Sequence, residues 1–395
     1  MWRAPVWQSG FRPYFLLGAV YGPLALAAWL GAYLGAWRVP SNLLEPGLWH
    51  GHEMVFGFVV AIVSGLLLTA LPSWAGVPEQ NGGTLALLVA AWLAGRAAMW
   101  LAPLLPAAAV AAADIAALPL LCVALAPGLL RARQRKFAVV LPVLLALAGA
   151  DAAFHAALGR GDSSGASTAL TAAVGIVVVL YSLVGGFMTP VFTNNVLRER
   201  GSARRAWRNR RLDLAAHALA VAFAVTQAVP VSSRLAAGVA AAACVAHTIR
   251  LAGWRGWEAR AAPLVAAMHA GYAWLVLAFG LAAAASLGLA GARDWLHAAT
   301  IGAFGLMMLA LMPRVSLRHT GRALALRPAM AATYVAMSGA ALLRLAFDGL
   351  GGPAWAALAA GALWSACFVV YLGLHAPMLL RPSLPRDATP GSAIP

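Results

Sequence analysis

Nine histidines are the residues with the widest chemical range in this sequence, which is otherwise poor in polar side chains. Only 10% of its 395 residues are charged, whereas 62% are hydrophobic. Neutral imidazole is a common ligand of iron and copper. Each histidine in an apolar segment is therefore a candidate metal or haem ligand, although taken singly it is more often a structural hydrogen-bonding group.

One short run holds two histidines and a carboxylate, Trp49-His50-Gly51-His52-Glu53. On a regular helix His50 and Glu53 lie three positions apart and share a face, whereas His52 points away from them. We therefore expect the two histidines to do different jobs. Glu53 is the candidate to orient an imidazole or to relay a proton.

These side chains must be positioned by membrane-spanning helices. The mean hydropathy is +0.81, and the charged content is far below the roughly 25% of soluble domains. A window of about 20 apolar residues, the length that crosses a bilayer, predicts about twelve spans. They lie near 14–36, 49–72, 84–102, 104–126, 137–158, 168–190, 212–231, 234–252, 262–285, 294–313, 328–347 and 353–377.

The composition excludes a soluble enzyme, a secreted disulfide scaffold and a disordered chain. We expect an all-α, polytopic integral membrane protein with a single helical domain over residues 1–380 and a flexible cytoplasmic tail over 381–395. The formal charge is +16, and most basic residues fall in the loops on one side of the predicted spans. The positive-inside rule places that side and both termini in the cytoplasm, so the basic charge does not indicate nucleic acid.

Projected onto these spans, the histidines form two layers. The outer layer holds His50, His52, His155 and His297. The cytoplasmic layer holds His217, His247, His269, His319 and His375. Four imidazoles at one depth on three helices are typical of a haem or copper site. The alternative is that they only make hydrogen bonds at the membrane interface.

Two further groups could serve a bound cofactor. His269 and Tyr272 share a helix face, and the phenol could hydrogen-bond a ligand. Arg314 and Arg322 flank His319, and guanidinium groups pair with carboxylates such as haem propionates. The alternative for the arginines is a basic loop that sets the topology.

Polar residues inside other spans predict structural features. Arg96 and Asp114 lie at similar depths in neighbouring spans and should form an ion pair, because neither charge is tolerable alone in hydrocarbon. The sixth span ends in Gly185-Gly186 and Pro190, followed by Asn194 and Asn195. This pattern predicts a broken helix end whose amides line a polar cavity.

Five motifs together resemble the NnrS family, twelve-helix membrane proteins associated with haem, copper and the nitric oxide response of denitrifying and related bacteria. The motifs are Phe11-Arg12-Pro13-Tyr14-Phe15, Trp49-His50-Gly51-His52-Glu53-Met54-Val55-Phe56-Gly57-Phe58, Phe192-Thr193-Asn194-Asn195, His269-Ala270-Gly271-Tyr272-Ala273-Trp274 and Arg314-Val315-Ser316-Leu317-Arg318-His319-Thr320-Gly321-Arg322. Two positions depart from the family pattern: Arg318 stands where glycine is expected, and Asp151 where asparagine is usual.

The resemblance implies a bacterial inner-membrane protein that binds nitric oxide (NO) and protects against nitrosative stress. It implies haem, expected as haem b, and copper as a second metal. By motif or by layer, the candidate metal ligands are His50, His52, His155, His269, His297 and His319, and the candidate cofactor-binding arginines are Arg314 and Arg322. Glu53 and Tyr272 are the candidate catalytic residues.

Several alternatives remain open from the sequence. NO is either only bound or also reduced to nitrous oxide, which requires an electron donor that the sequence does not identify. The chain could instead be a transporter of metal, haem or an anion, for which related halves are expected and none is found. A haem-binding sensor or assembly factor would carry the same ligand residues. Apolar faces of the helices are expected against lipid or against a second copy of the chain.

Overall fold

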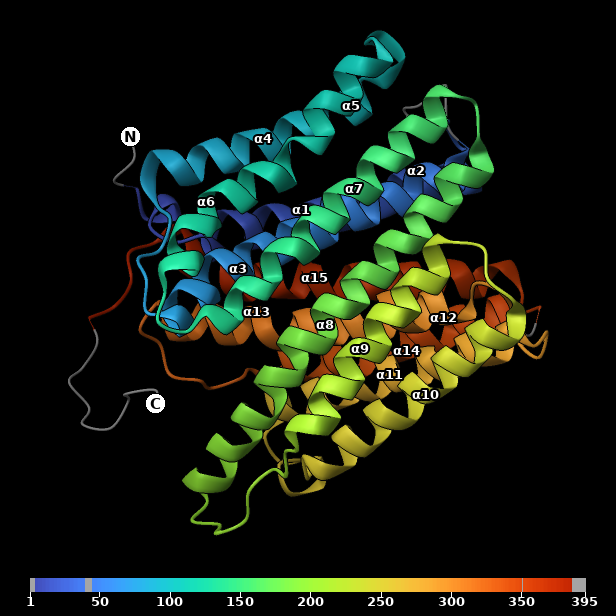
Figure 1. Ribbon diagram of the computed structural model, residues 1–395. Coiled ribbons are helices and arrows are strands. Elements are labelled where there is room, and N and C mark those ends of the chain that lie inside the picture. Colours follow the sequence, from blue (N-terminus) through green and yellow to red (C-terminus); the bar gives the residue numbers. More distant parts are fainter. Residues whose placement is uncertain (1–3, 40–44, 350, 386–395) are drawn as a thin grey trace.

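The computed structural model describes residues 4–39, 45–349 and 351–385, and every regular element in these ranges is a helix. They form one bundle of long, roughly aligned rods (Figure 1). The helices are α1 (Phe11–Tyr33), α2 (Pro46–His52), η2 (Glu53–Val59), α3 (Val60–Ala75), α4 (Gly82–Trp100), α5 (Ala107–Ile115), α6 (Ala117–Arg131), α7 (Val140–Gly159), α8 (Ser163–Glu199), α9 (Arg210–Ala228), α10 (Ser233–Gly253), α11 (Pro263–Ser286), α12 (Asp294–His297), η6 (Ala298–Gly305), α13 (Leu306–His319), α14 (Pro328–Gly349) and α15 (Ala354–Leu380).

These elements join end to end into twelve rods across the described residues, and eleven of the rods are long and apolar enough to cross a membrane. The twelfth, α9, begins Arg210-Arg211-Leu212-Asp213, and these charges lower the hydropathy of its first turn. The prediction of an all-α polytopic membrane protein with about twelve helices is confirmed.

Two of the rods change their helical geometry close to a histidine. α2 ends at His52 and continues as the π-helix η2 before α3 begins. α12 ends at His297 and continues as the π-helix η6 before α13 begins. A π-helix has i→i+5 hydrogen bonds and therefore turns less per residue, so it changes which side chains share a face, and it often lies at functional sites.

The predicted helix break near Pro190 is wrong. α8 runs through Pro190 to Glu199, a helix of 37 residues. A proline removes one hydrogen bond within a helix and its ring crowds the backbone carbonyl four positions earlier, here that of Gly186, but α8 continues past it as a helix. The two amides make hydrogen bonds close by: the Asn194 side chain accepts one from the backbone of Ala206, and Asn195 accepts one from Arg198.

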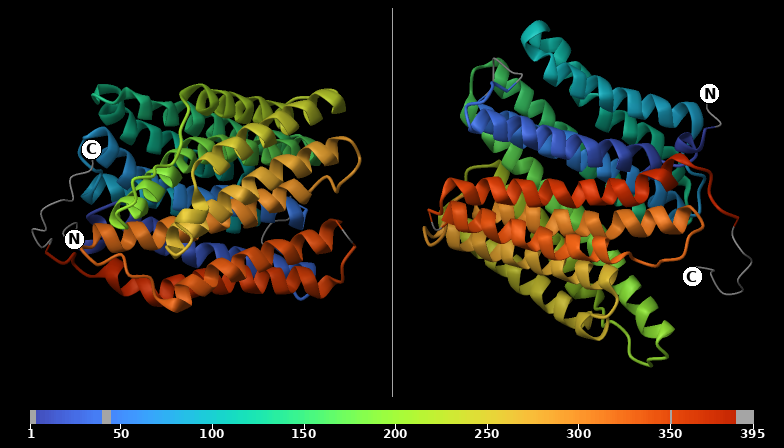
Figure 2. Two further views of the ribbon diagram at one scale, coloured as in Figure 1. Left: turned by 90° about the horizontal axis from the view of Figure 1, so that it is seen from below. Right: turned by 180° about the vertical axis from the view of Figure 1, so that it is seen from behind.

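The start of α1 and the end of α15 lie at the same end of the bundle (Figures 1 and 2). Arg12, only 1% exposed, joins them by donating hydrogen bonds to the carbonyl oxygens of Leu379 and Arg381, both at 2.8 Å. Which side of the membrane this end faces stays a prediction. Of the predicted tail 381–395, residues 386–395 lie outside the described residues.

Candidate functional site

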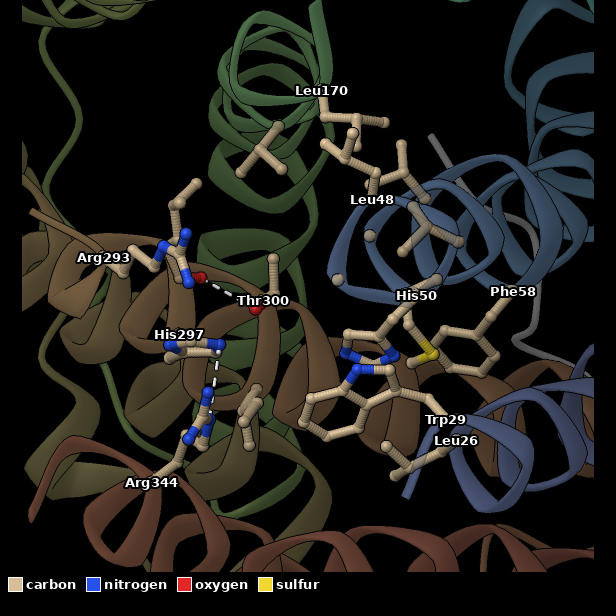
Figure 3. Close-up of a pocket in the computed structure, with 18 of the residues that line it drawn as sticks. Leu26, Trp29, Leu48, His50, Phe58, Leu170, Arg293, His297, Thr300 and Arg344 are labelled. Atoms are coloured by element: carbon tan, nitrogen blue, oxygen red, sulfur yellow. Dashed lines mark hydrogen bonds between the residues drawn. The ribbon is translucent and has the colours of Figure 1, made fainter. Parts of the chain in front are cut away.

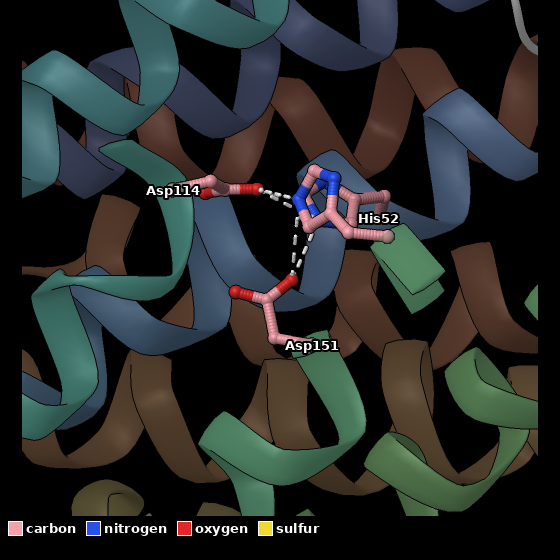
Figure 4. Close-up of side chains that lie close together, drawn as sticks. His52, Asp114 and Asp151 are labelled. Carbon is pink, nitrogen blue, oxygen red and sulfur yellow. Dashed lines mark hydrogen bonds and ion pairs between the residues drawn. The ribbon is translucent and has the colours of Figure 1, made fainter. Parts of the chain in front are cut away.

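A buried cluster of two histidines and two aspartates lies where three helices meet (Figure 4). Nε2 of His52 is 3.0 Å from Oδ2 of Asp114 and 3.1 Å from Oδ1 of Asp151. Nε2 of His155 is 2.9 Å from the same Asp114 oxygen. The four side chains are between 0% and 8% exposed, so the cluster is closed to solvent.

Local sequence explains how the helices bring these groups together. Asp151 and His155 are one turn apart on α7 and therefore share a face. Asp114 lies on α5, which packs closely on α4 at Gly95: a Cβ atom there would come within 3.0 Å of the Asp114 backbone. His52 enters from the last position of α2. We call His52, Asp114, Asp151 and His155 the His/Asp cluster.

Arg96 and Glu53 extend the His/Asp cluster on one side. Arg96 pairs with Asp114, as predicted from the sequence, and its second nitrogen lies 2.7 Å from Oε1 of Glu53. The same Glu53 oxygen is 2.9 Å from Nδ1 of His52. Tyr21 donates its hydroxyl proton to the other oxygen of Glu53, so this carboxylate orients the imidazole and is itself held in place.

The expected sharing of a face by His50 and Glu53 is wrong. Glu53 lies beside His52 in the His/Asp cluster, whereas His50 lines a different cavity. The prediction assumed a regular α-helix, but the π-helix η2 begins at Glu53 and alters the angular spacing of the residues there. The expectation that His50 and His52 occupy different environments agrees with this geometry.

The geometry of the His/Asp cluster suits a metal ion. Ligand atoms around a tetrahedral ion with bonds of 2.0–2.1 Å lie about 3.3–3.4 Å apart. The nitrogen–oxygen separations between its histidines and aspartates run from 2.9 to 3.7 Å, and all four candidate ligand atoms lie within 4.8 Å of one another. Two imidazoles and two carboxylates, without sulfur, suit a divalent ion such as Cu²⁺, Zn²⁺ or Fe²⁺ rather than Cu⁺. Protonated imidazoles would hold the same atoms by hydrogen bonds.

A second feature, the histidine cavity, has a volume of about 300 Å³ and is lined by His50 and His297 (Figure 3). Its walls are mostly apolar and include Leu26, Trp29, Leu48, Phe58, Leu170 and Phe304. The ring of His50 stacks on Trp29 with the centroids 4.3 Å apart. Nδ1 of His50 is buried and has no hydrogen-bond partner among the described residues. This nitrogen can therefore coordinate a metal or form a hydrogen bond with a bound molecule.

His297 is oriented by a carboxylate that the sequence analysis missed. Its Nδ1 lies 2.6 Å from Oδ2 of Asp348, and Asp348 also pairs with Arg344 at 3.2 Å. A carboxylate on one imidazole nitrogen fixes the tautomer and leaves the other nitrogen as the ligand, as in many metal-binding histidines. That nitrogen, Nε2, accepts a hydrogen bond from Nε of Arg344 at 3.4 Å, which a metal bound there would replace.

The lining of the histidine cavity fits haem in chemical type. Imidazoles come from two different helices, the walls are apolar, and Arg293 and Arg344 add positive charge near His297 (Figure 3). Guanidinium groups pair readily with carboxylates such as propionates. The volume is at the small end of the usual range for ligand cavities, about 300–1,000 Å³.

The predicted outer layer of histidines is thus divided between two sites. His52 and His155 belong to the His/Asp cluster, and His50 and His297 to the histidine cavity. Because His50 and His52 are two residues apart on α2, the two sites lie on different sides of one helix.

The structure places His269 and Tyr272 in neither site. Nε2 of His269 is 2.9 Å from the Thr193 hydroxyl. The Tyr272 hydroxyl lies 2.6 Å from a guanidinium nitrogen of Arg250 and 2.7 Å from Nδ1 of His247. These contacts form a separate polar network between α8, α10 and α11.

His319, Arg314 and Arg322 also lie elsewhere, at the end of α13. The Arg314 guanidinium stacks 3.6 Å from the centre of the Phe192 ring, and Arg322 donates to the Thr320 carbonyl. Nδ1 of His319 is 4.0 Å from Glu79. Arg318, where glycine was expected, lies in the regular helix α13, and the left-handed position is Gly321, with φ of 73°.

The sequence contained signals for the residues that were missed. Asp151 precedes His155 by four positions and Arg344 precedes Asp348 by four, each pair inside or next to an apolar span. Ionisable residues at such positions are functional candidates by default. Asp114 had been assigned only as a partner for Arg96.

Comparison with known proteins identifies the family. No curated protein matches the chain significantly. The family model described as NnrS protein matches residues 5–383, which include both sites. This multi-pass membrane chain therefore belongs to the NnrS family.

Proposed function

We propose that this chain is a haem protein of the bacterial inner membrane that binds nitric oxide and contributes to protection against nitrosative stress. The observation that carries the proposal is the histidine cavity, in which imidazoles from two helices line one apolar space beside two arginines. Membership of the NnrS family supports NO as the ligand.

His297 and His50 are the two imidazoles at the site. One of them would ligate the haem iron and the other would lie near the bound gas, while Arg293 with Arg344 would pair with the propionates. Haem iron with one imidazole ligand supplies an open position for a diatomic gas. Asp348 holds the His297 ring from its Nδ1 side, and the apolar walls exclude water. We expect haem b, because the three cysteines have no CxxCH spacing for covalent attachment.

The His/Asp cluster is the proposed site of a second metal, with copper as the expected ion. Three carboxylates meet here, those of Asp114, Asp151 and the adjoining Glu53, and the one guanidinium among them, that of Arg96, pairs with Asp114 and Glu53. Two negative charges therefore remain in a buried place, where uncompensated charge is strongly unfavourable. A divalent cation balances them fully while both histidines stay neutral, which is the form that binds metal.

The catalytic reaction to test is the reduction of NO to nitrous oxide. It consumes two NO, two electrons and two protons and releases N₂O and water, with the electrons coming from an external donor. Glu53 is the residue placed to hold a proton, because its carboxylate contacts both the Tyr21 hydroxyl and the His52 imidazole.

Optical absorption of the detergent-purified protein tests the proposal. We expect a haem band that shifts when NO is added to the reduced protein. His297→Ala and His50→Ala should remove the haem or change the band, because each variant deletes an imidazole at the histidine cavity. His217→Ala is the matched control: His217 bonds to Ser182 and does not line the cavity, so its spectrum should match the wild type.

Two results would contradict the proposed haem site, and a third would contradict the binding of NO. One is an unchanged spectrum in both cavity variants when they are folded, which would exclude His50 and His297 as ligands. The other is purified protein without haem from cells that make haem in excess, which would favour a transporter. A haem band that does not respond to NO would restrict the role to electron transfer or sensing.

A further inference from the structure

A second, smaller cavity of about 60 Å³ lies between α1, α3, α8, η6 and α13. Its walls are aliphatic and aromatic groups together with the thioethers of Met307, Met308 and Met312. Methionine side chains are flexible and polarizable, so this wall can adjust to a small guest. None of the histidines, arginines or carboxylates of the proposed haem and metal sites lines this small apolar cavity.

Its size and chemistry restrict what it can hold. A single water molecule needs about 10–15 Å³ and two to four polar partners. The small apolar cavity has the volume for a few atoms, but its side chains are apolar apart from Tyr181. Cavities of this type stay dry and bind apolar guests such as xenon.

The small apolar cavity adjoins the histidine cavity. Val177 of α8 and Phe304 of η6 line both spaces, so these two side chains form the partition between them. Both side chains are buried, so a diatomic molecule would pass between the two spaces when one of them changes its rotamer. Phe304 belongs to the π-helix that begins directly after His297.

We propose that the small apolar cavity is a docking site for a dissolved diatomic gas, from which the gas enters the histidine cavity past Val177 and Phe304. The identity of the gas as NO rests on the proposed function. NO is small and nearly apolar, so it concentrates in the hydrocarbon core of the membrane. The docking site is placed to collect it from there rather than from water.

Xenon binding tests the site without any haem chemistry. A crystal of the full-length protein, with whatever cofactors it retains, would be pressurised with xenon and its anomalous scattering measured. We expect xenon between Val184, Leu66 and Met307, and none at that position in Val184→Phe, whose ring fills the space. Ordered water in the small apolar cavity, or xenon elsewhere in the wild-type protein but not there, would overturn the proposal.

Two further variants show whether a loss of xenon in Val184→Phe comes from filling the cavity or from misfolding. Gly185→Ala adds one methyl group that would lie 3.2 Å from Cε of Met307 and 3.2 Å from the Tyr181 ring, and both side chains line the cavity. It therefore fills part of the space with a smaller change than Val184→Phe. Leu183→Phe is the control, because Leu183 is next to Val184 on α8 but does not line the cavity. Xenon should be lost or reduced in Gly185→Ala and retained in Leu183→Phe.

The passage of NO is measured by flash photolysis of the NO complex of the reduced protein. The rate of NO association should fall several-fold in Val184→Phe, while the equilibrium spectrum and the Leu183→Phe rate stay unchanged. An unchanged rate in a variant that has lost xenon would overturn the path. Bound xenon in a protein without haem would support the docking site while contradicting the proposed function, so the two failures are distinguishable.

Discussion

Replacement of His155 tests whether the His/Asp cluster binds a metal without breaking the ion pairs of Arg96. Asp114 cannot serve, because it also pairs with Arg96 and its removal leaves a buried guanidinium partly unpaired. His52 touches Glu53 as well as both aspartates. Among the described residues, His155 forms ion pairs only with the two aspartates and has an edge-to-face ring contact with His52, at a centroid distance of 5.6 Å. Its replacement therefore removes one candidate metal ligand and leaves the Arg96 pairs intact.

We predict that His155→Ala lowers the affinity of the purified protein for a divalent metal at least about tenfold, since even the loss of an outer-shell partner costs that much. Elemental analysis and competition with a chelator measure it. Asp151→Asn should have a smaller effect, because an amide oxygen remains a donor. The control is Asp162→Asn, an exposed helix cap. Metal content in His155→Ala equal to that of the control would exclude the His/Asp cluster as the site.

At the scale of helices, hydropathy predicted the spans well and helical periodicity predicted the site poorly. Span limits follow from the bilayer, which requires about 20 apolar residues and satisfied backbone groups. The pairing of Arg96 with Asp114 followed from the same requirement. The π-helix at Glu53 has no comparable residue signature, so the faces of His50, His52 and Glu53 were assigned on the wrong geometry.

Contacts between helices distant in the sequence were the other limit. The local pattern on α2 gave no information on Asp114 or Asp151, which approach His52 only once α5 and α7 have packed. Asp348 was missed because it lies close to a loop, where a charge requires no explanation, and only the fold brings it to His297. Residue types identified candidates, whereas partners depended on packing.

The motif that opens the chain has a structural explanation at this scale. Arg12 caps α15, whose last carbonyl groups have no partners within the helix. We predict that Arg12→Ala lowers the thermal stability of the purified protein. A cost of about 1–3 kcal/mol is expected from lost hydrogen bonds to a charged donor. Arg38→Ala, at an exposed position, should melt like the wild type; equal melting temperatures for the two variants would show that the cap is dispensable.

At the scale of the whole molecule, the surface divides into an apolar belt and charged ends. Large apolar side chains project outward from the helices, among them Leu87, Val123 and Val335, which are 60%, 68% and 76% exposed. Exposed apolar side chains of this size are expected to face membrane lipid rather than water. The loop between α8 and α9 is instead rich in arginine, and by the positive-inside rule it should face the cytoplasm.

Labelling of single cysteines tests this orientation and, with it, the direction from which the histidine cavity is reached. After replacement of Cys122, Cys244 and Cys367, one cysteine is introduced at Ala203, in the arginine-rich loop, or at Ser233, at the start of α10. A membrane-impermeant maleimide added to spheroplasts should label Ser233→Cys and leave Ala203→Cys unlabelled until the cells are lysed, when both should react.

The reverse pattern would invert the predicted topology and place both termini outside. Because α9 runs antiparallel to its neighbour α8 and the loop to α10 is short, Ser233 lies at the same end of the bundle as the first residue of α8, Ser163 (Figure 1). Ser163 lines the histidine cavity. Labelling at Ser233 from outside would therefore place this cavity near the outer face of the membrane, with the arginine-rich loop at the opposite face.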